Sequence, residues 1–194
     1  MWEWIKKLFK KPKVENMEIR KLEYLISHWL SSKTRVDQIN GERYYKGNHD
    51  ILSKKRKAIV EGGRLEDINN LVNSKLVDNQ YSKMVDQKVN YILAKKPTFI
   101  CKNENVLKLF GNKFLKTLRN LGEDTLNGGI GWIYPYFNQK GGLQFRKFEP
   151  SEILPIWKDN NKDELELAIR LYEVLEFQHN SLVPVKKVEV YSGN

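Results

Sequence analysis

The residues best suited to chemistry in this chain stand together at Gly47-Asn48-His49-Asp50, where an amide, an imidazole and a carboxylate follow a glycine. Side chains of these types ligate divalent metals, and a pair of bridged metals can activate water for phosphoester hydrolysis. Such a centre needs several further ligands, but the chain has only three histidines, His28, His49 and His179. We therefore expect no metal here, and a turn that caps the following segment.

Two other catalytic patterns are equally incomplete. The single cysteine, Cys101, lies in a predicted strand and can form neither an internal disulfide nor a metal cluster. The glycines of residues 128–131 lack the Gly-Lys-Ser/Thr ending of a phosphate-binding loop, and they precede a predicted strand rather than a helix. The sequence therefore predicts no catalytic residue and no cofactor, and we expect a protein that is not an enzyme.

The charge of the chain is basic and uneven. The net charge is +10, and residues 1–57 hold 15 lysines and arginines against 7 acidic residues, whereas the remainder holds 19 against 17. A basic amino-terminal third indicates a polyanion such as DNA, and a solvated lysine-rich surface is the alternative. The densest basic run is Lys54, Lys55, Arg56 and Lys57, which makes it the candidate contact for such a partner.

Residues 1–15 form a basic amino-terminal arm in which Trp4, Ile5, Leu8 and Phe9 could share one face of a short helix. Lysines interrupt the apolar residues and no cleavage site follows, so the segment is not a secretory signal. A membrane-surface helix is a weaker alternative to an arm that packs on a neighbouring protein or is disordered. No apolar run approaches the roughly 18–20 residues that span a bilayer, so we expect no membrane partner.

The hydrophobic periodicity predicts an α+β fold with helices first and a mainly antiparallel sheet second. The helical part covers residues 16–121 and the mostly β part covers residues 130–191. Within 16–194, which we take as one domain, a loop is expected at 48–70. The expected helices are 16–31, 33–45, 73–97 and 104–121, and the expected strands are 98–101, 132–137, 143–148, 153–157, 166–175 and 185–191.

The segment 73–97 is predicted to form one long amphipathic helix of about six turns that ends at Pro97. Lys88 falls within its apolar arc, where it would either extend its amine to solvent or pair with another helix or subunit. The apolar side is predicted to form core and comprises Val77, Tyr81, Met84, Val85, Tyr91 and Ile92. The polar side comprises Asn79, Ser82, Lys83, Asp86 and Asn90.

Two phrases of the sequence act together as a signature. The first runs from Tyr44 to Leu52 (YYKGNHDIL), and the second runs from Asn73 to Leu93 (NSKLVDNQYSKMVDQKVNYIL). In wording, order and spacing they resemble the portal proteins of tailed bacteriophages, in the subgroup similar to the portal of Bacillus phage SPP1. The phrases at 149–156 and 168–172 fit more loosely. The segment at 94–97 reads Ala-Lys-Lys-Pro where the family usually has Gly-Lys-Pro.

The resemblance implies a structural subunit of a ring, commonly of twelve copies, at one capsid vertex of the virion. Such a ring is made in the host bacterial cytoplasm and serves as the channel for DNA packaging and ejection and as the connector to the tail. Its partners are other copies of itself, terminase, scaffold, major capsid and head-completion proteins, and double-stranded DNA. The resemblance covers the amino-terminal, wing part of a portal, so we expect the stem, clip and crown to be absent and the chain to be a fragment or a truncated prophage product.

The resemblance also assigns roles to residues. The run Lys54–Lys57 becomes a candidate for DNA or scaffold contact, and Asp86, Lys88 and Asn90 become candidates for contact between subunits. Two alternatives remain open at this point. One is a basic DNA-binding module without ring assembly, and the other is a phosphoesterase, because residues 47–50 are similar to the GNH-D/E element of binuclear metallophosphoesterases.

Overall fold

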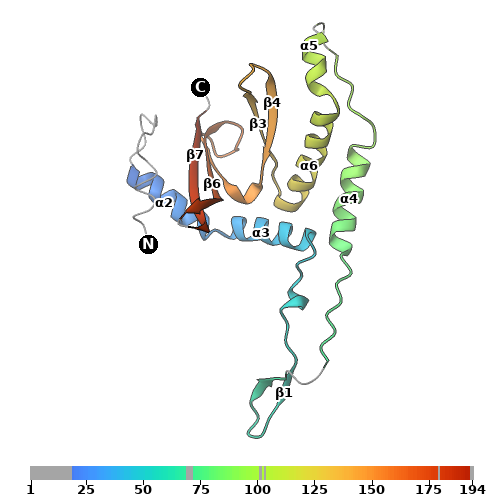
Figure 1. Ribbon diagram of the computed structural model, residues 1–194, viewed down its shortest axis with the longest axis vertical. Coiled ribbons are helices and arrows are strands. Elements are labelled where there is room, and N and C mark those ends of the chain that lie inside the picture. Colours follow the sequence, from blue (N-terminus) through green and yellow to red (C-terminus); the bar gives the residue numbers. More distant parts are fainter. Residues whose placement is uncertain (1–18, 69–71, 101, 103, 179, 193–194) are drawn as a thin grey trace.

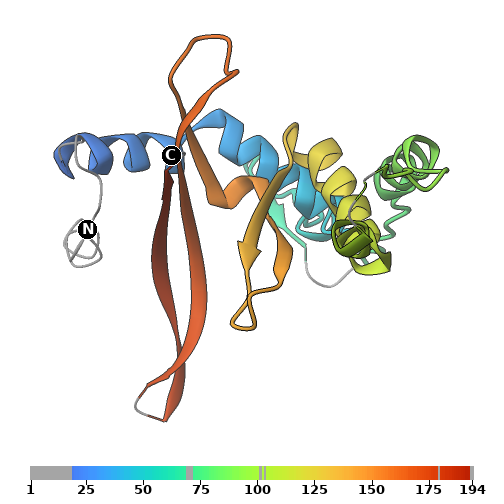
Figure 2. The same ribbon diagram turned by 90° about the horizontal axis from the view of Figure 1, so that it is seen from above.

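The structure is a computed structural model, and it describes residues 19–68, 72–100, 102, 104–178 and 180–192. Helices occupy the first part of the chain and antiparallel strands the second, so the predicted α+β fold class is confirmed. Figures 1 and 2 show the elements side by side, with α2 and the β6–β7 hairpin at one side and α4 at the other. The helix α3, the β3–β4 hairpin and α6 lie between these two sides.

The main core lies between helix α2 (Ile19–Leu30) and a three-stranded sheet of order β5–β6–β7. The strands are β5 (Ile153–Trp157), β6 (Leu165–Gln178) and β7 (Ser181–Ser192). Leucine and isoleucine recur on α2 at helical spacing, so one stripe of the helix faces the sheet. The buried residues of this core are Leu22, Ile26, Trp29, Leu154, Ile169 and Leu171.

A second sheet is the hairpin of β3 (Trp132–Phe137) and β4 (Leu143–Phe148), which has the residues that its sequence predicted. Its six residue pairs run from Trp132 opposite Phe148 to Phe137 opposite Leu143. Gly141 turns the chain with φ of 75°, a conformation that favours glycine. Phe145 of this hairpin packs against Phe114 of α6, with ring centroids 4.9 Å apart.

The helices α3 (Lys33–Tyr45) and α6 (Asn112–Gly128) approach each other closely. A Cβ atom added to Gly41 of α3 would lie 2.2 Å from the carbonyl oxygen of Asn127, so only glycine permits this crossing. The amide of Gln38, which is buried, donates a hydrogen bond to the carbonyl of Gly128 at 3.3 Å. This contact fixes the carboxyl end of α6 against α3.

The connection between α3 and α4 projects away from the rest of the molecule (Figure 1). It contains the short helix η1 (Asp50–Leu52) and a small hairpin of β1 (Lys57–Ile59) and β2 (Leu65–Asp67). The prediction of a loop throughout residues 48–70 is therefore wrong for these segments. Short alternating strands on either side of Gly62 and Gly63 are typical of a hairpin, and that signal was present in the sequence.

Helix α4 (Gln80–Ile92) has 13 residues, so the prediction of one helix over 73–97 is wrong. The described residues before it are not helical, because the Asn79 side chain accepts a hydrogen bond from the Ser82 amide and caps the first turn there. The expected strand at 98–101 is absent over residues 98–100, and residue 101 lies outside the described residues. The predicted amino-terminal arm also lies outside them.

The helix predicted at 104–121 is divided in the structure. It consists of α5 (Glu104–Leu107), the 3-10 turn η2 (Lys108–Phe110) and α6, which continues seven residues beyond the predicted end to Gly128. The division falls at Gly111, whose backbone is extended and precedes the first turn of α6. The short helix η3 (Pro150–Glu152) then leads into β5.

Candidate functional site: the α3–α4 clamp and two uncovered faces

The two signature phrases meet at Asn79. Its side-chain Nδ2 donates hydrogen bonds to the carbonyl oxygens of Tyr44 at 3.1 Å and Tyr45 at 2.9 Å. Its Oδ1 accepts from the Ser82 amide at 3.1 Å and lies 3.2 Å from Nε2 of His49. The last carbonyls of a helix and the first amides of the next have no partner within their own helices. One asparagine therefore satisfies both helix ends and joins them.

A second bond strengthens this junction, which we call the α3–α4 clamp and define by Tyr44, Tyr45, His49, Asp50, Asn79 and Asp86. The Tyr45 hydroxyl donates to Oδ1 of Asp86, on the first turns of α4, at 2.8 Å. Burial and this hydrogen bond raise the pKa of Tyr45 above its ordinary value. Asp86, a predicted subunit contact, is thus engaged within its own chain.

The residues that could have served as metal ligands have structural partners instead. Asp50 accepts hydrogen bonds from the Tyr44 hydroxyl at 2.6 Å and from Arg43 Nη1 at 2.7 Å, and these bonds hold the pKa of Asp50 below its usual range. His49 stacks at a tilt on the ring of Tyr44, with centroids 4.8 Å apart. Gly47 has φ of 82°, which allows the turn between them. The described residues contain no group of three or more His, Cys, Asp and Glu side chains placed to hold a metal.

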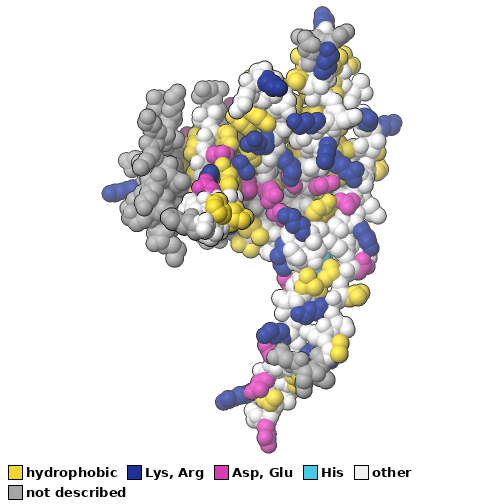
Figure 3. All heavy atoms as spheres, viewed as in Figure 1, with side chains coloured by type: hydrophobic (Ala, Val, Ile, Leu, Met, Phe, Trp, Pro, Cys, Tyr) yellow, Lys and Arg dark blue, Asp and Glu magenta, His cyan; other side chains and the backbone are white. Residues whose placement is uncertain are grey.

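The basic run of residues 54–57 is exposed along the α3–α4 connection. Lys55 pairs with Asp67 of β2 at 3.0 Å, so part of the run helps to close the β1–β2 hairpin. Basic side chains are spread over the face seen in Figure 3, along the connection and over the body, rather than gathered in one patch. The structure does not bring this run together with the predicted contacts on α4.

The outer face of α4 is apolar and uncovered. Only Val85 and Val89 of this helix are buried, so the prediction that Met84, Tyr91 and Ile92 form core is wrong. These three side chains are 57%, 87% and 69% exposed. Together with Gln87 and Lys88 they line a shallow, open hollow on the surface, and we call these five residues the α4 outer face.

The three predicted contact residues of α4 do not share one side. Asp86 and Asn90 are one turn apart, and Lys88 projects from the opposite side at helical spacing. Lys88 and Asn90 are exposed, and Asp86 is half-buried against Tyr45. Of the three, Lys88 alone belongs to the α4 outer face.

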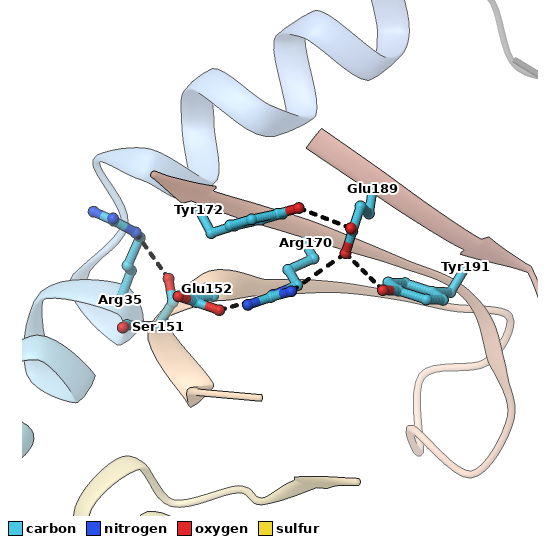
Figure 4. Close-up of polar contacts among 7 residues, drawn as sticks. All are labelled: Arg35, Ser151, Glu152, Arg170, Tyr172, Glu189 and Tyr191. Atoms are coloured by element: carbon cyan, nitrogen blue, oxygen red, sulfur yellow. Dashed lines mark hydrogen bonds and ion pairs between the residues drawn. The ribbon is translucent and has the colours of Figure 1, made fainter. Parts of the chain in front are cut away.

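Sequence reasoning missed a polar cluster at the base of the β6–β7 hairpin, drawn in Figure 4. The Arg170 guanidinium contacts Glu152 through Nε at 2.8 Å and Glu189 through Nη1 at 3.3 Å. Glu189 also accepts hydrogen bonds from the hydroxyls of Tyr172 and Tyr191, at 2.8 and 2.7 Å. We call these five residues the Arg170 cluster, and it ties η3, β6 and β7 together.

The electrostatics of this cluster favour the ionised carboxylate. Burial alone would raise the pKa of Glu189, but the hydrogen bonds from Tyr191 and Tyr172 and the nearby Arg170 bring it below its ordinary value. The Arg170 guanidinium also lies over the rings of Tyr172 and Phe148, at 3.9 and 4.4 Å from their centroids. The β5–β6 register places Glu152 beside Arg170, and the β6–β7 register places Glu189 opposite it. The sequence alone specifies neither register.

A cleft of about 250 Å³ lies beside this cluster, between α2, α3, η3 and the hairpin. Arg35 contributes to its wall, donates from Nε to the Ser151 carbonyl at 3.1 Å and has a pKa lowered by burial. Its guanidinium lies 5.1 Å from the Trp29 ring centroid. These contacts join α2, α3 and η3, so this part of the chain is built for rigidity.

These features define the class: an α+β structural module with a tied helix pair, a rigid sheet base and two uncovered apolar surfaces. The second surface lies on the β6–β7 hairpin, where Leu175, Phe177 and Leu182 are 63%, 70% and 64% exposed. The family model described as "Phage portal protein, SPP1 Gp6-like" matches residues 22–194, and the chain belongs to this family. The resemblance drawn from the two signature phrases is thereby confirmed.

Two curated relatives carry the name portal protein. That of Clostridium phage phiCD119 is 25% identical over 173 residues, which are 82% of this chain and 37% of the relative. That of Bacillus phage SPP1 is 25% identical over 138 residues, which are 69% of this chain and 27% of the relative. The chain thus spans about a third of the length of these relatives. Within its described part, no helix combines the length and hydrophobicity that crossing a bilayer requires.

Proposed function

We propose that this chain is the wing part of a structural subunit of a phage portal ring and has no enzymatic role. The family match over residues 22–194 carries the proposal, because it includes both phrases that form the α3–α4 clamp. A ring subunit has to hold its shape while it contacts a neighbour on each side. The clamp and the Arg170 cluster supply that rigidity, and the uncovered apolar faces supply surface for contacts.

In this proposal the ring, of twelve copies in the whole protein, forms the channel at the capsid vertex of the virion. DNA enters through it during packaging and leaves through it at ejection, and a separate ATPase, the terminase, supplies the energy. Scaffold, major capsid and head-completion proteins contact its outside. The run Lys54–Lys57, on the projecting connection, is the proposed contact for DNA or scaffold.

The experiment is native mass spectrometry and negative-stain microscopy of the protein expressed from its complete reading frame. We expect closed ring-shaped particles with one dominant copy number. Circular dichroism establishes that the sample is folded. A folded protein that remains monomeric at about 100 µM, well above the micromolar Kd of weak interfaces, contradicts the proposal.

The second candidate function is a DNA-binding module without ring assembly, favoured by the exposure of the run Lys54–Lys57. If these residues make four phosphate contacts, the slope of log binding constant against log salt concentration becomes more negative by roughly 3–4. The test replaces all four residues by glutamine and measures binding to duplex DNA between 50 and 200 mM salt. The matched control replaces Lys95, Lys96, Lys102 and Lys108, which are also exposed.

A loss of DNA affinity confined to the first variant, in a protein that stays monomeric, favours the second candidate. Equal losses of DNA affinity in both variants would mean that DNA binds through the general positive charge of the surface and not through the run Lys54–Lys57 in particular.

A further inference from the structure

The two strands of the β6–β7 hairpin carry a mainly apolar face that one charged pair interrupts. Successive residues on this face alternate along β6, and the register places each opposite a residue of β7. At the base, Ile169 lies opposite Val190 and Leu171 opposite Val188, and these pairs pack under α2. Farther along, the same face carries Glu173 opposite Lys186, Leu175 opposite Pro184, and Phe177 opposite Leu182.

The far half of this face is uncovered. Leu175, Phe177 and Leu182 are 63%, 70% and 64% exposed, and Pro184 is exposed beside them. Figure 2 shows this end of the hairpin projecting beyond the remaining elements. We call these four residues the hairpin tip face. Exposed apolar groups that lie next to one another on a rigid element mark a contact site.

The molecule itself shows which kind of element fits this face. At the base of the same hairpin the covering element is a helix, α2, which inserts Leu22, Ile26 and Trp29 against the strands. The tip face continues that surface beyond α2, which crosses the hairpin near its base (Figure 2). A second helix with a stripe of large apolar side chains would extend the same packing.

The α4 outer face presents such a stripe, with Met84, Tyr91 and Ile92 exposed on one side of a 13-residue helix. It lies at the opposite side of the molecule from the hairpin in both views (Figures 1 and 2). The two faces therefore cannot meet within one copy. Two different faces on opposite sides of one body make a head-to-tail contact, the kind that closes a ring.

Each of the two faces carries a charge that has an opposite charge on the other face. Lys88 is exposed at the centre of the α4 outer face. Glu173 stands at the border of the tip face, and its ion pair with Lys186 is long, at 3.8 Å between two exposed side chains. A surface pair of this kind contributes little stability, so Glu173 can accept a cation from a neighbour.

We propose that the α4 outer face of one copy docks on the hairpin tip face of the next copy, with Lys88 against Glu173. The proposal rests on the proposed ring function and names the two surfaces that would form its contact. It assigns the tip face to a helix of a second copy rather than to the amino-terminal segment or to chain beyond residue 194.

Mixed cysteine cross-linking tests this contact in the protein from its complete reading frame, with Cys101→Ser as background. One preparation carries Tyr91→Cys and the other Phe177→Cys, and the two are mixed and oxidised with a copper–phenanthroline catalyst and dissolved oxygen. We expect a disulfide-linked dimer that forms at least about tenfold faster in the mixture than in either preparation alone. The matched control is Phe137→Cys, which is 73% exposed at the tip of the β3–β4 hairpin.

The outcomes separate this inference from the ring function. Oligomers in which Tyr91→Cys reacts no faster with Phe177→Cys than with Phe137→Cys overturn the inference and leave the ring intact. Cross-linking of Tyr91→Cys with itself overturns it in favour of a symmetric α4 contact. Faster reaction of Phe177→Cys with Trp4→Cys would assign the tip face to the amino-terminal segment. A folded protein that forms no oligomer overturns both proposals.

Charge reversal provides an independent measurement. Lys88→Glu and Glu173→Lys each place like charges across the proposed contact, and each should weaken self-association by about tenfold. The chain that carries both changes restores an opposite pair and should recover to within about threefold of the original. If the double variant loses as much self-association affinity as the two single losses multiplied together, the proposed contact is wrong.

Discussion

The two halves of the β6–β7 hairpin share one face and one register but differ in what covers them. At the base, Ile169 is fully buried under α2, whereas at the tip Phe177 is 70% exposed. The alternation of side chains along both strands is the same in the two halves. Strand pattern therefore decides which residues share a face, and the position of a neighbouring helix decides whether that face is buried in the core or remains exposed.

The largest predicted effect tests this difference directly. Ile169→Ala should lower the free energy of unfolding by about 2–5 kcal/mol, because it removes buried methyl groups and leaves a cavity under α2. Phe177→Ala should change it by less than about 0.5 kcal/mol, since it removes a side chain that is mostly in water. Urea denaturation of both variants at a concentration where the protein is monomeric measures the two values.

Comparable losses for both substitutions would show that the tip is covered within a single copy, and the distinction between the two halves would fail. A Phe177→Ala cost that appears only at high protein concentration would instead indicate burial between copies.

The next effect concerns the opposite face of the base, where the Arg170 cluster lies. Arg170→Gln leaves Glu152 and Glu189 without their cation, and the side chain of Arg170 is only 16% exposed. Removing one member of a buried pair costs about 3–5 kcal/mol, and we expect about 2–3 kcal/mol here because the two carboxylates are partly in water. Denaturation by urea again provides the measurement.

Glu173→Gln is the matched control, because it breaks an ion pair on the same hairpin where both partners are exposed. Its expected cost is below about 0.5 kcal/mol. If Arg170→Gln and Glu173→Gln lower the free energy of unfolding by the same amount, the base of the hairpin is not the more rigid half.

Elements with local signals were predictable from the sequence. The bounds of α3, of the β3–β4 hairpin and of β5 match their predictions, because caps, turns and alternation lie within or beside those segments. The prediction of a helix over 73–97 was wrong at its start, because the apolar spacing begins at Val77, whereas Asn79 caps the helix and bonds the end of α3. A distant contact thus overrode a local pattern.

The candidate site was predictable only in part. The two signature phrases indicated the family, but they did not state that Asn79 would join them or that Asp86 would bond Tyr45. The helical wheel placed Met84, Tyr91 and Ile92 toward the core, because an apolar stripe that stays exposed has the same spacing as one that packs in the interior. Only the arrangement of α3 and α6 around α4 decides which stripe is buried.

The smallest predicted effect concerns how carboxylates in the two halves of the hairpin make the free energy of unfolding depend on pH. The lowered pKa of Glu189 means that its ionised form contributes stability above the carboxyl pKa of the unfolded chain, about 4.3, and that this contribution is lost as pH falls through the folded value. Glu189→Gln should therefore reduce the fall in unfolding free energy between about pH 5 and pH 3, by less than about 1 kcal/mol given its partial exposure.

At the tip, the hydrogen bond from Lys187 also lowers the pKa of Glu176, but here the bonding partner is a surface cation, whose attraction salt screens. Glu176→Gln should alter the pH dependence at low ionic strength and have no effect in about 1 M salt, where screening reaches within about 3 Å. The effect of Glu189→Gln should persist in that salt, because two of the groups that bond the base carboxylate are neutral tyrosine hydroxyls, whose hydrogen bonds salt screens little. Equal salt sensitivity of the two variants would mean that the charge of Arg170, rather than the tyrosine hydroxyls, stabilises the base carboxylate.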